Sequence, residues 1–184
     1  MSVQSCVRLL ERTPHLTSLY FYPTDPIIFS TVLRLWHLRD LDLCRGVYYR
    51  DALAKLNSLT ALTALTVADI GEESSVGLAA LTQLRELTME ESHMHACPPA
   101  MRALSVASPK SELPTALPTT LQRLELKKGV FDLRASDLAH LRILQIGLDV
   151  RARFPAVPQL TRLQWNATEQ YSAGNFDMFP DRIR

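Results

Sequence analysis

The chain has 184 residues, of which 47% are hydrophobic and 21% are charged, and its formal net charge is +1. A nearly neutral chain of this length fits one domain or one array of repeats, and it argues against strong electrostatic binding to nucleic acid or an anionic membrane. Three widely separated cysteines argue against a disulfide-stapled fold, and no apolar run reaches the roughly 18 residues that a membrane span needs.

The N-terminal segment predicts a helix. Val3, Cys6, Val7 and Leu10 have the spacing of the apolar stripe of an amphipathic helix. We expect residues 1–15 to cap the first structural unit or to be the tail of a preceding one. The segment has no apolar core of signal-peptide length, so we expect a soluble, cytoplasmic protein.

From there the chain repeats one leucine pattern. The steps between successive apolar residues are 3, 3, 3 and 2, and the same steps recur 22 residues later. The two copies are Leu56, Leu59, Leu62, Leu65 and Val67, then Leu78, Leu81, Leu84, Leu87 and Met89. Three-residue steps place leucines on one side of a tight turn, whereas the final two-residue step is strand alternation. One unit is therefore a connecting segment followed by a short strand. It cannot bury its apolar face alone, so we expect the copies to stack into a parallel sheet.

The strand part of this pattern, L-x-x-L-x-L, recurs eight times at spacings of 17 to 24 residues. The last two apolar residues of the copies are Leu19 and Phe21, Leu41 and Leu43, Leu65 and Val67, Leu87 and Met89, Leu104 and Val106, Leu124 and Leu126, Leu144 and Ile146, and Leu163 and Trp165. The fifth copy is the weakest, because it begins with Met101 after the shortest spacing.

This pattern resembles that of leucine-rich repeat (LRR) proteins of the irregular intracellular type. The resemblance implies an α/β fold: a right-handed solenoid with a parallel concave sheet and short helices, 3₁₀ turns or extended segments on the convex side. It also implies one domain of about eight repeats over residues 1–184. The family places asparagine or a small polar residue three positions after the last strand residue. This chain has no asparagine there, and the positions are Thr24, Gly46, Ile70, Ser92, Pro109, Gly129, Asp149 and Thr168.

The connecting segments differ between the two halves of the chain. Asp25 before Pro26 reads as a helix cap followed by a first-turn proline, and Asp51 ahead of Leu56 reads similarly. The later units are shorter and have a proline ahead of the strand, at Pro98, Pro118 and Pro158. Proline favours an extended or 3₁₀-like back. We therefore expect helices on the convex side early in the chain and thinner backs late, with the transition within residues 90–120.

The C-terminal segment resembles the beginning of another unit. Residues 179–183, with Pro180 in second place, match residues 117–121, with Pro118 in the same place. We expect residues 167–184 to be a C-terminal cap or the start of a truncated ninth repeat.

Strand residues that alternate with the buried ones line one side of the sheet, which we call the concave face. It comprises, in each copy, the residue before, the residue between and the residue after the last two apolar residues. The candidate protein-binding residues on it are Tyr20, Tyr22, Asp40, Asp42, Thr66, Glu86, Thr88, Glu90, Arg123, Glu125, Lys127, Gln145, Arg162 and Gln164. The face is aromatic at its start, then acidic, then basic. Strands about 4.8 Å apart would extend it over roughly 35 Å, which suits a protein or peptide better than a small molecule. Tyr20 and Tyr22 are the best anchors, since tyrosine is enriched among interface hot spots.

Paired carboxylates occur twice on this face, as Asp40 with Asp42 and as Glu86 with Glu90. Such pairs perform acid–base chemistry when one member is desolvated. On an open sheet both members stay hydrated, so we interpret the pairs as solvated charges. No glycine-rich phosphate loop and no nucleophile motif occurs in the sequence.

Possible metal ligands and nucleophiles are few. His93, His95 and Cys97 lie within five residues, but no second Cys/His cluster completes the tetrahedral set that zinc prefers. Cys44 and Cys97 have no sequence partner that would activate a thiolate. We therefore predict no catalytic residue, no metal and no cofactor.

The function that these observations favour is a non-catalytic module that presents its concave face to a protein or peptide partner, without nucleic acid, membrane or small-molecule substrate. The resemblance implies an alternative, in which the chain is the recognition array of a larger protein. Ubiquitin-ligase substrate adaptors, immune receptors and effectors are examples, and their catalytic or signalling domain would be absent here. An enzyme, and a structural array that assembles through its ends, are further alternatives.

Overall fold

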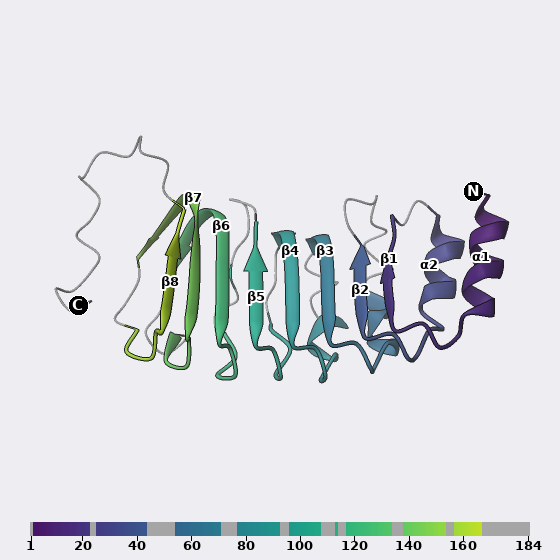
Figure 1. Cartoon of the computed structure of the whole chain (residues 1–184), viewed down its shortest axis with the longest axis horizontal. Coiled ribbons are helices and arrows are strands. Elements are labelled where there is room, and N and C mark those ends of the chain that lie inside the picture. The colour runs from purple at the N-terminus through teal and green to yellow at the C-terminus, as the bar shows by residue number, and fades with distance from the viewer. Residues whose placement is uncertain are drawn as a thin grey trace.

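The protein is described by a computed structural model, which places residues 2–22, 25–43, 54–70, 77–92, 96–107, 113, 117–133, 138–153 and 157–166. Eight strands form one parallel sheet, and their order in space is their order in the chain (Figure 1). The strands are β1 (Ser18–Tyr20), β2 (Asp40–Leu43), β3 (Ala64–Ile70), β4 (Glu86–Ser92), β5 (Ala103–Val106), β6 (Arg123–Asp132), β7 (Ile143–Arg153) and β8 (Arg162–Trp165). This architecture confirms the prediction of an LRR solenoid.

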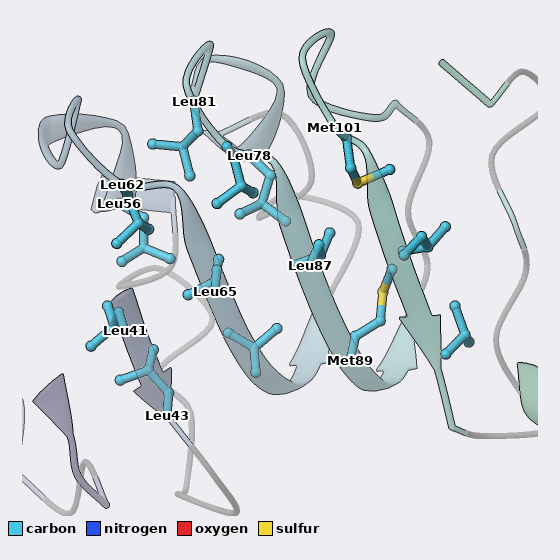
Figure 2. Close-up of a cluster of buried hydrophobic side chains, with 14 of the residues drawn as sticks. Leu41, Leu43, Leu56, Leu62, Leu65, Leu78, Leu81, Leu87, Met89 and Met101 are labelled. Carbon is cyan, nitrogen blue, oxygen red and sulfur yellow. The ribbon is translucent and has the colours of Figure 1, made fainter. Parts of the chain in front are cut away.

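The strand leucines form one continuous core on one side of the sheet. Leu41 pairs with Leu65, Leu65 with Leu87, and Leu87 with Leu104 in neighbouring strands. The central strand leucines are at most 3% exposed. Figure 2 shows strand residues and residues of the connecting turns pointing into the same cluster. The fifth copy, the weakest in sequence, pairs in register with both neighbours, and Met101 is fully buried.

The three-residue leucine steps mark 3₁₀-like turns. The backbone N–H of Leu62 donates to the carbonyl of Leu59 at 3.0 Å, and that of Leu84 donates to the carbonyl of Leu81 at 3.0 Å. In a 3₁₀ turn the residues i and i+3 lie above one another, so leucines at this spacing share the buried side. The same bond joins Leu121 to Pro118 at 2.9 Å, which shows why a proline three residues ahead of a leucine is compatible with the turn.

Each turn is also tied to the preceding repeat at the point where the strand begins. The Arg39 carbonyl accepts the N–H groups of Thr63 and Ala64, at 2.8 and 2.9 Å, and the Thr63 hydroxyl donates to the same oxygen at 3.0 Å. The Thr161 hydroxyl makes the equivalent bond to the Arg142 carbonyl, also at 3.0 Å. These bonds satisfy backbone groups that the turn would otherwise leave without partners.

The two predicted N-terminal helices are present. Helix α1 spans Val3–Arg12, with Ser2 as its N-cap, and helix α2 spans Pro26–Val32. The Asp25 side chain accepts the backbone N–H of Ile27 at 2.8 Å, as the cap-and-proline pattern predicts. The helices lie side by side at the N-terminal end of the row (Figure 1). Asp51 lies outside the described residues, and the segment that follows it is a 3₁₀ helix, η1 (Ala54–Ser58).

The sheet continues past the concave positions, for two residue pairs between β3 and β4 and for five between β6 and β7, which the two-residue alternation did not predict. Strands β6 and β7 pair along the concave face and again from Lys128 opposite Asp149 to Asp132 opposite Arg153, with a register shift between Leu126 and Lys128. These extended segments agree with the prediction that the convex side carries helices early in the chain and thinner backs late. The 19–20-residue units have no room for a helix, so strand pairing satisfies the backbone there.

Two glycines make this pairing of β6 and β7 possible. Gly129 has a φ of 130°, a conformation that residues with a Cβ rarely adopt. Gly147 lies against the irregularity in β6, where a Cβ would overlap the Lys127 carbonyl oxygen and lie 2.7 Å from the carbonyl carbon. The backbones of β6 and β7 therefore approach one another more closely than any other residue type would allow.

The two predicted caps, residues 1–15 and 167–184, lie at the ends of the array. Helix α1 packs on α2 through its apolar stripe, with Leu10 buried and Val3, Cys6 and Val7 partly buried. The role of residues 1–15 as a cap stays a prediction, and residues 167–184 lie outside the described part of the chain. Within that described part, no helix is both long enough and apolar enough to span a bilayer.

Candidate functional site

The strand register brings the predicted concave-face residues into straight rows across the sheet. One row runs through the residues between each apolar pair: Tyr20, Asp42, Thr66, Thr88, Ser105, Glu125, Gln145 and Gln164. A second row, one alternation earlier, is Ser18, Asp40, Ala64, Glu86, Ala103, Arg123, Ile143 and Arg162. Residues up to about 144 positions apart in sequence thus share one surface.

The N-terminal end of this face is aromatic and acidic. The Tyr20 and Tyr22 rings meet edge to face, with centroids 5.7 Å apart, and their hydroxyls lie 3.0 Å apart. Both side chains remain largely accessible, at 60% and 51% exposure. Tyr20 pairs in register with Asp42, and the Ser18 hydroxyl donates to a carboxylate oxygen of Asp40 at 3.4 Å. Ring faces beside carboxylates form a surface that suits a cationic side chain.

The C-terminal end is basic and amide-rich. Arg123 and Arg162 are exposed. Lys127 Nζ lies 3.9 Å from an oxygen of Glu125. The side-chain amide of Gln145 donates to the Gln164 carbonyl oxygen at 2.9 Å, across β7 and β8. The order of aromatic, acidic and basic zones predicted from the sequence is therefore the order along the sheet.

The middle of the face contains only small side chains on β5. Ala103, Ser105 and Ala107 take the three concave positions there. Ser105 is only 8% exposed, and its hydroxyl is the one buried side-chain oxygen or nitrogen in the described part of the chain that has no hydrogen-bond partner. The strand pattern alone predicts an accessible serine. It is recessed because the longer Thr88 and Glu125 stand on either side of it in the row.

An exposed aromatic group was missed by the sequence analysis. Trp36, in the turn that leads into β2, is 61% exposed and stacks on His37 with 3.6 Å between ring centroids. The ring centroid of His37 lies 5.4 Å from that of His15, which is in the equivalent turn before β1. One feature of the sequence indicates that the two histidines are close. His15 and His37 occupy the same place in consecutive repeats, one residue ahead of Leu16 and Leu38.

The described residues contain no group of three or more His, Cys, Asp or Glu side chains placed to hold a metal ion. His93 and His95 lie outside them. Asp40, Glu86 and Glu90 are exposed at the surface, as expected for solvated charges. What the face offers is hydrogen bonds, charge and aromatic area, which are the means of recognising a macromolecule.

The Cys97 side chain is partly buried against the hydrophobic core. Desolvation by burial raises the pKa of its thiol to about 12, from an ordinary value of 9.0. The thiolate is the nucleophilic form, so this thiol is unreactive near neutral pH. In the folded protein we expect iodoacetamide at about pH 8 to alkylate Cys97 at least ~10-fold more slowly than in urea. Peptide mass spectrometry over time measures both rates, and equal rates would contradict the burial described here.

Comparison with known proteins agrees with the fold. No family model and no curated protein matches the sequence. Among solved structures, an internalin from Listeria monocytogenes superposes on 90% of this chain with a TM-score of 0.59 and 18% sequence identity. The chain spans about half of that structure, 51% of its length. At this identity the likeness concerns the fold, and it supports the LRR solenoid independently of the leucine spacing.

Proposed function

We propose that the chain is a non-catalytic binding module that presents its concave face to a protein or peptide partner. The observation that carries this proposal is the pair of accessible tyrosines at one end of a face that extends across eight strands and carries acidic and basic zones. Tyrosine supplies a large contact area with little conformational entropy to lose, and adjoining charged zones fix the orientation of a partner. The LRR fold itself is typical of non-catalytic binding modules.

A second candidate is the recognition array of a larger protein. It is favoured by the share of the internalin structure that the chain spans, about half. Substrate adaptors of ubiquitin ligases, immune receptors and effectors would combine such an array with a catalytic or signalling domain. In either case the concave face performs the recognition. A cytoplasmic location stays part of the proposal, on the grounds of the three sparse cysteines.

The test is affinity capture with the whole chain and two matched double variants. Tyr20→Ser with Tyr22→Ser removes the aromatic pair from the concave face. Ile27→Ser with Trp36→Ser removes two side chains of similar exposure, 59% and 61%, that lie outside the strands. We expect the tyrosine variant to bind the captured partner at least ~10-fold more weakly than the unaltered chain, as when hot-spot residues are removed. We expect the control variant to bind it with unchanged affinity.

Circular dichroism spectra that match the unaltered chain establish that both variants are folded. A partner bound equally by the tyrosine variant and the unaltered chain would contradict the assignment of the concave face. Loss of binding only in the Ile27 and Trp36 variant would move the site to α2 and the turn that precedes β2.

A further inference from the structure

Charge on the concave face alternates from strand to strand and is arranged symmetrically about β5. Strands β2, β4, β6 and β8 carry charged side chains there, whereas β3, β5 and β7 carry none at the three concave positions. The charges on one side of β5 are all acidic, and those on the other side are basic with the exception of Glu125. The charged residues are Asp40, Asp42, Glu86, Glu90, Arg123, Glu125, Lys127 and Arg162.

This arrangement is complementary to itself. Consider a second copy placed face to face with the first and related to it by a two-fold axis parallel to β5. All strands are parallel, so the rotation keeps each residue at its height along the strand and exchanges β2 with β8 and β4 with β6. Asp40 then faces Arg162, and Glu86 faces Arg123, because these four residues share one row of the register.

A third pair lies four residues further along the strands. Glu90 and Lys127 come directly after Met89 and Leu126, which both pair with Val106 of β5 and so lie at one height along the strands. The same rotation places Glu90 opposite Lys127 of the second copy. Each pair occurs twice in a two-fold assembly. The other in-plane axis, along the row of strands, would place each acidic strand opposite itself and is unfavourable.

We propose that the partner recognised by the concave face is a second copy of this chain, in a two-fold dimer whose axis runs parallel to β5. The inference rests on the proposed function, because it uses the same face. The small residues of β5 lie on the axis, where Ser105 of each copy faces its own equivalent.

The two faces oppose one another from β2 to β8, so the outermost contacts join β2 of one copy to β8 of the other. Arg162 of the second copy approaches Asp40 beside the Tyr20 and Tyr22 rings, a setting in which a guanidinium both pairs and stacks. The overlapping part of the face, from β2 to β8, measures about 29 Å by 15 Å, roughly 430 Å² of sheet per copy. An interface of this size is below the roughly 1,200–2,000 Å² in total that stable complexes bury, so we expect the dimer to be weak and sensitive to salt.

Analytical ultracentrifugation of the whole chain over a concentration series tests this inference. We expect a monomer–dimer equilibrium in low salt that shifts toward monomer on addition of about 0.5 M NaCl, because the Debye length then falls below ~5 Å. Asp40→Arg and Arg162→Glu each create two like-charge contacts in the dimer. We expect each variant alone to dimerise at least ~10-fold more weakly than the unaltered chain.

Mixing the two variants provides the decisive readout. In an equimolar mixture each reversed residue meets an opposite charge on the other variant, so we expect the heterodimer to form with nearly the original affinity. Glu11→Arg and Lys55→Glu change the net charge by the same amounts at exposed positions on α1 and η1, and they should leave dimerisation unchanged. A chain that is monomeric at about 100 µM in low salt, or variants whose mixture stays monomeric, would overturn the inference. If such a chain still captures another protein through its tyrosines, the proposed function stands without the dimer.

Discussion

Replacement of Leu87 by alanine is expected to lower the free energy of unfolding by about 2–5 kcal/mol. Leu87 lies in β4, is 1% exposed, and packs between Leu65 and Leu104 of the neighbouring strands. Truncation removes buried apolar area and leaves a cavity that both neighbours line. Each repeat is stabilised mainly by its neighbours, so a defect in the middle of the stack weakens the contacts on both sides.

Urea unfolding followed by circular dichroism measures this loss. The matched control is Leu163→Ala, at the same position of the last strand, where the leucine is only partly buried and only β7 adjoins it within the described sheet. We expect Leu163→Ala to lower the free energy of unfolding clearly less than Leu87→Ala does. If the central variant unfolded at the same urea concentration as the unaltered chain, the packing described for β3 to β5 would be wrong.

The second large effect is expected at the N-terminal helix. Leu10→Asp places a carboxylate where α1 meets α2, at a side chain that is 8% exposed. A buried, unpaired charge is among the most destabilising changes, and we expect a loss of about 3 kcal/mol or more. Leu9→Asp is the control, since Leu9 directly precedes Leu10 in the same helix and is 55% exposed. We expect Leu9→Asp to change the free energy of unfolding by no more than about 0.5 kcal/mol.

Hydrogen exchange distinguishes local from global damage in the Leu10→Asp variant. Repeat arrays unfold from their ends, so we expect faster exchange in α1, α2 and β1 and nearly normal protection in β4 and β5. Equal destabilisation by Leu9→Asp and Leu10→Asp would show that α1 does not pack on the array as described.

The leucine spacing was sufficient to predict the fold because each step of the pattern has one structural meaning. The three-residue steps became 3₁₀ turns, such as the bond from Leu84 to Leu81, and the two-residue steps became paired strands. The capped helix at Asp25 and Pro26 was predicted for the same reason, since both residues act within one turn of chain.

Features that depend on contacts between repeats were not predicted. The pairing of β6 and β7 beyond the concave positions requires Gly147 to lie against the Lys127 backbone, and no local pattern encodes that approach. The recessed position of Ser105 depends on the lengths of its neighbours in two other repeats. The stacking of Trp36 on His37, and the closeness of His15, likewise arise from the placement of consecutive turns.

The candidate site was predictable as a set of positions but not as a charge pattern. Alternation along each strand determined which residues share the concave face, and the register confirms the rows. The symmetry about β5 became visible only after Asp40 and Arg162 were found in one row, six strands apart. The binding roles of these residues stay predictions.

Distances between spin labels test the stacked architecture most directly. Cysteines introduced at Ser18, Glu86, Arg123 and Arg162, in a chain whose native cysteines are replaced, place labels in one row on β1, β4, β6 and β8. From Ser18, we predict backbone separations that rise in equal steps of about 4.8 Å per strand, to about 14, 24 and 34 Å. Mixing the labelled chain with an excess of unlabelled chain removes the contribution of distances between labels on different copies. A label at Arg162 that lies no farther from Ser18 than the label at Glu86 would contradict a sheet of eight rungs in chain order.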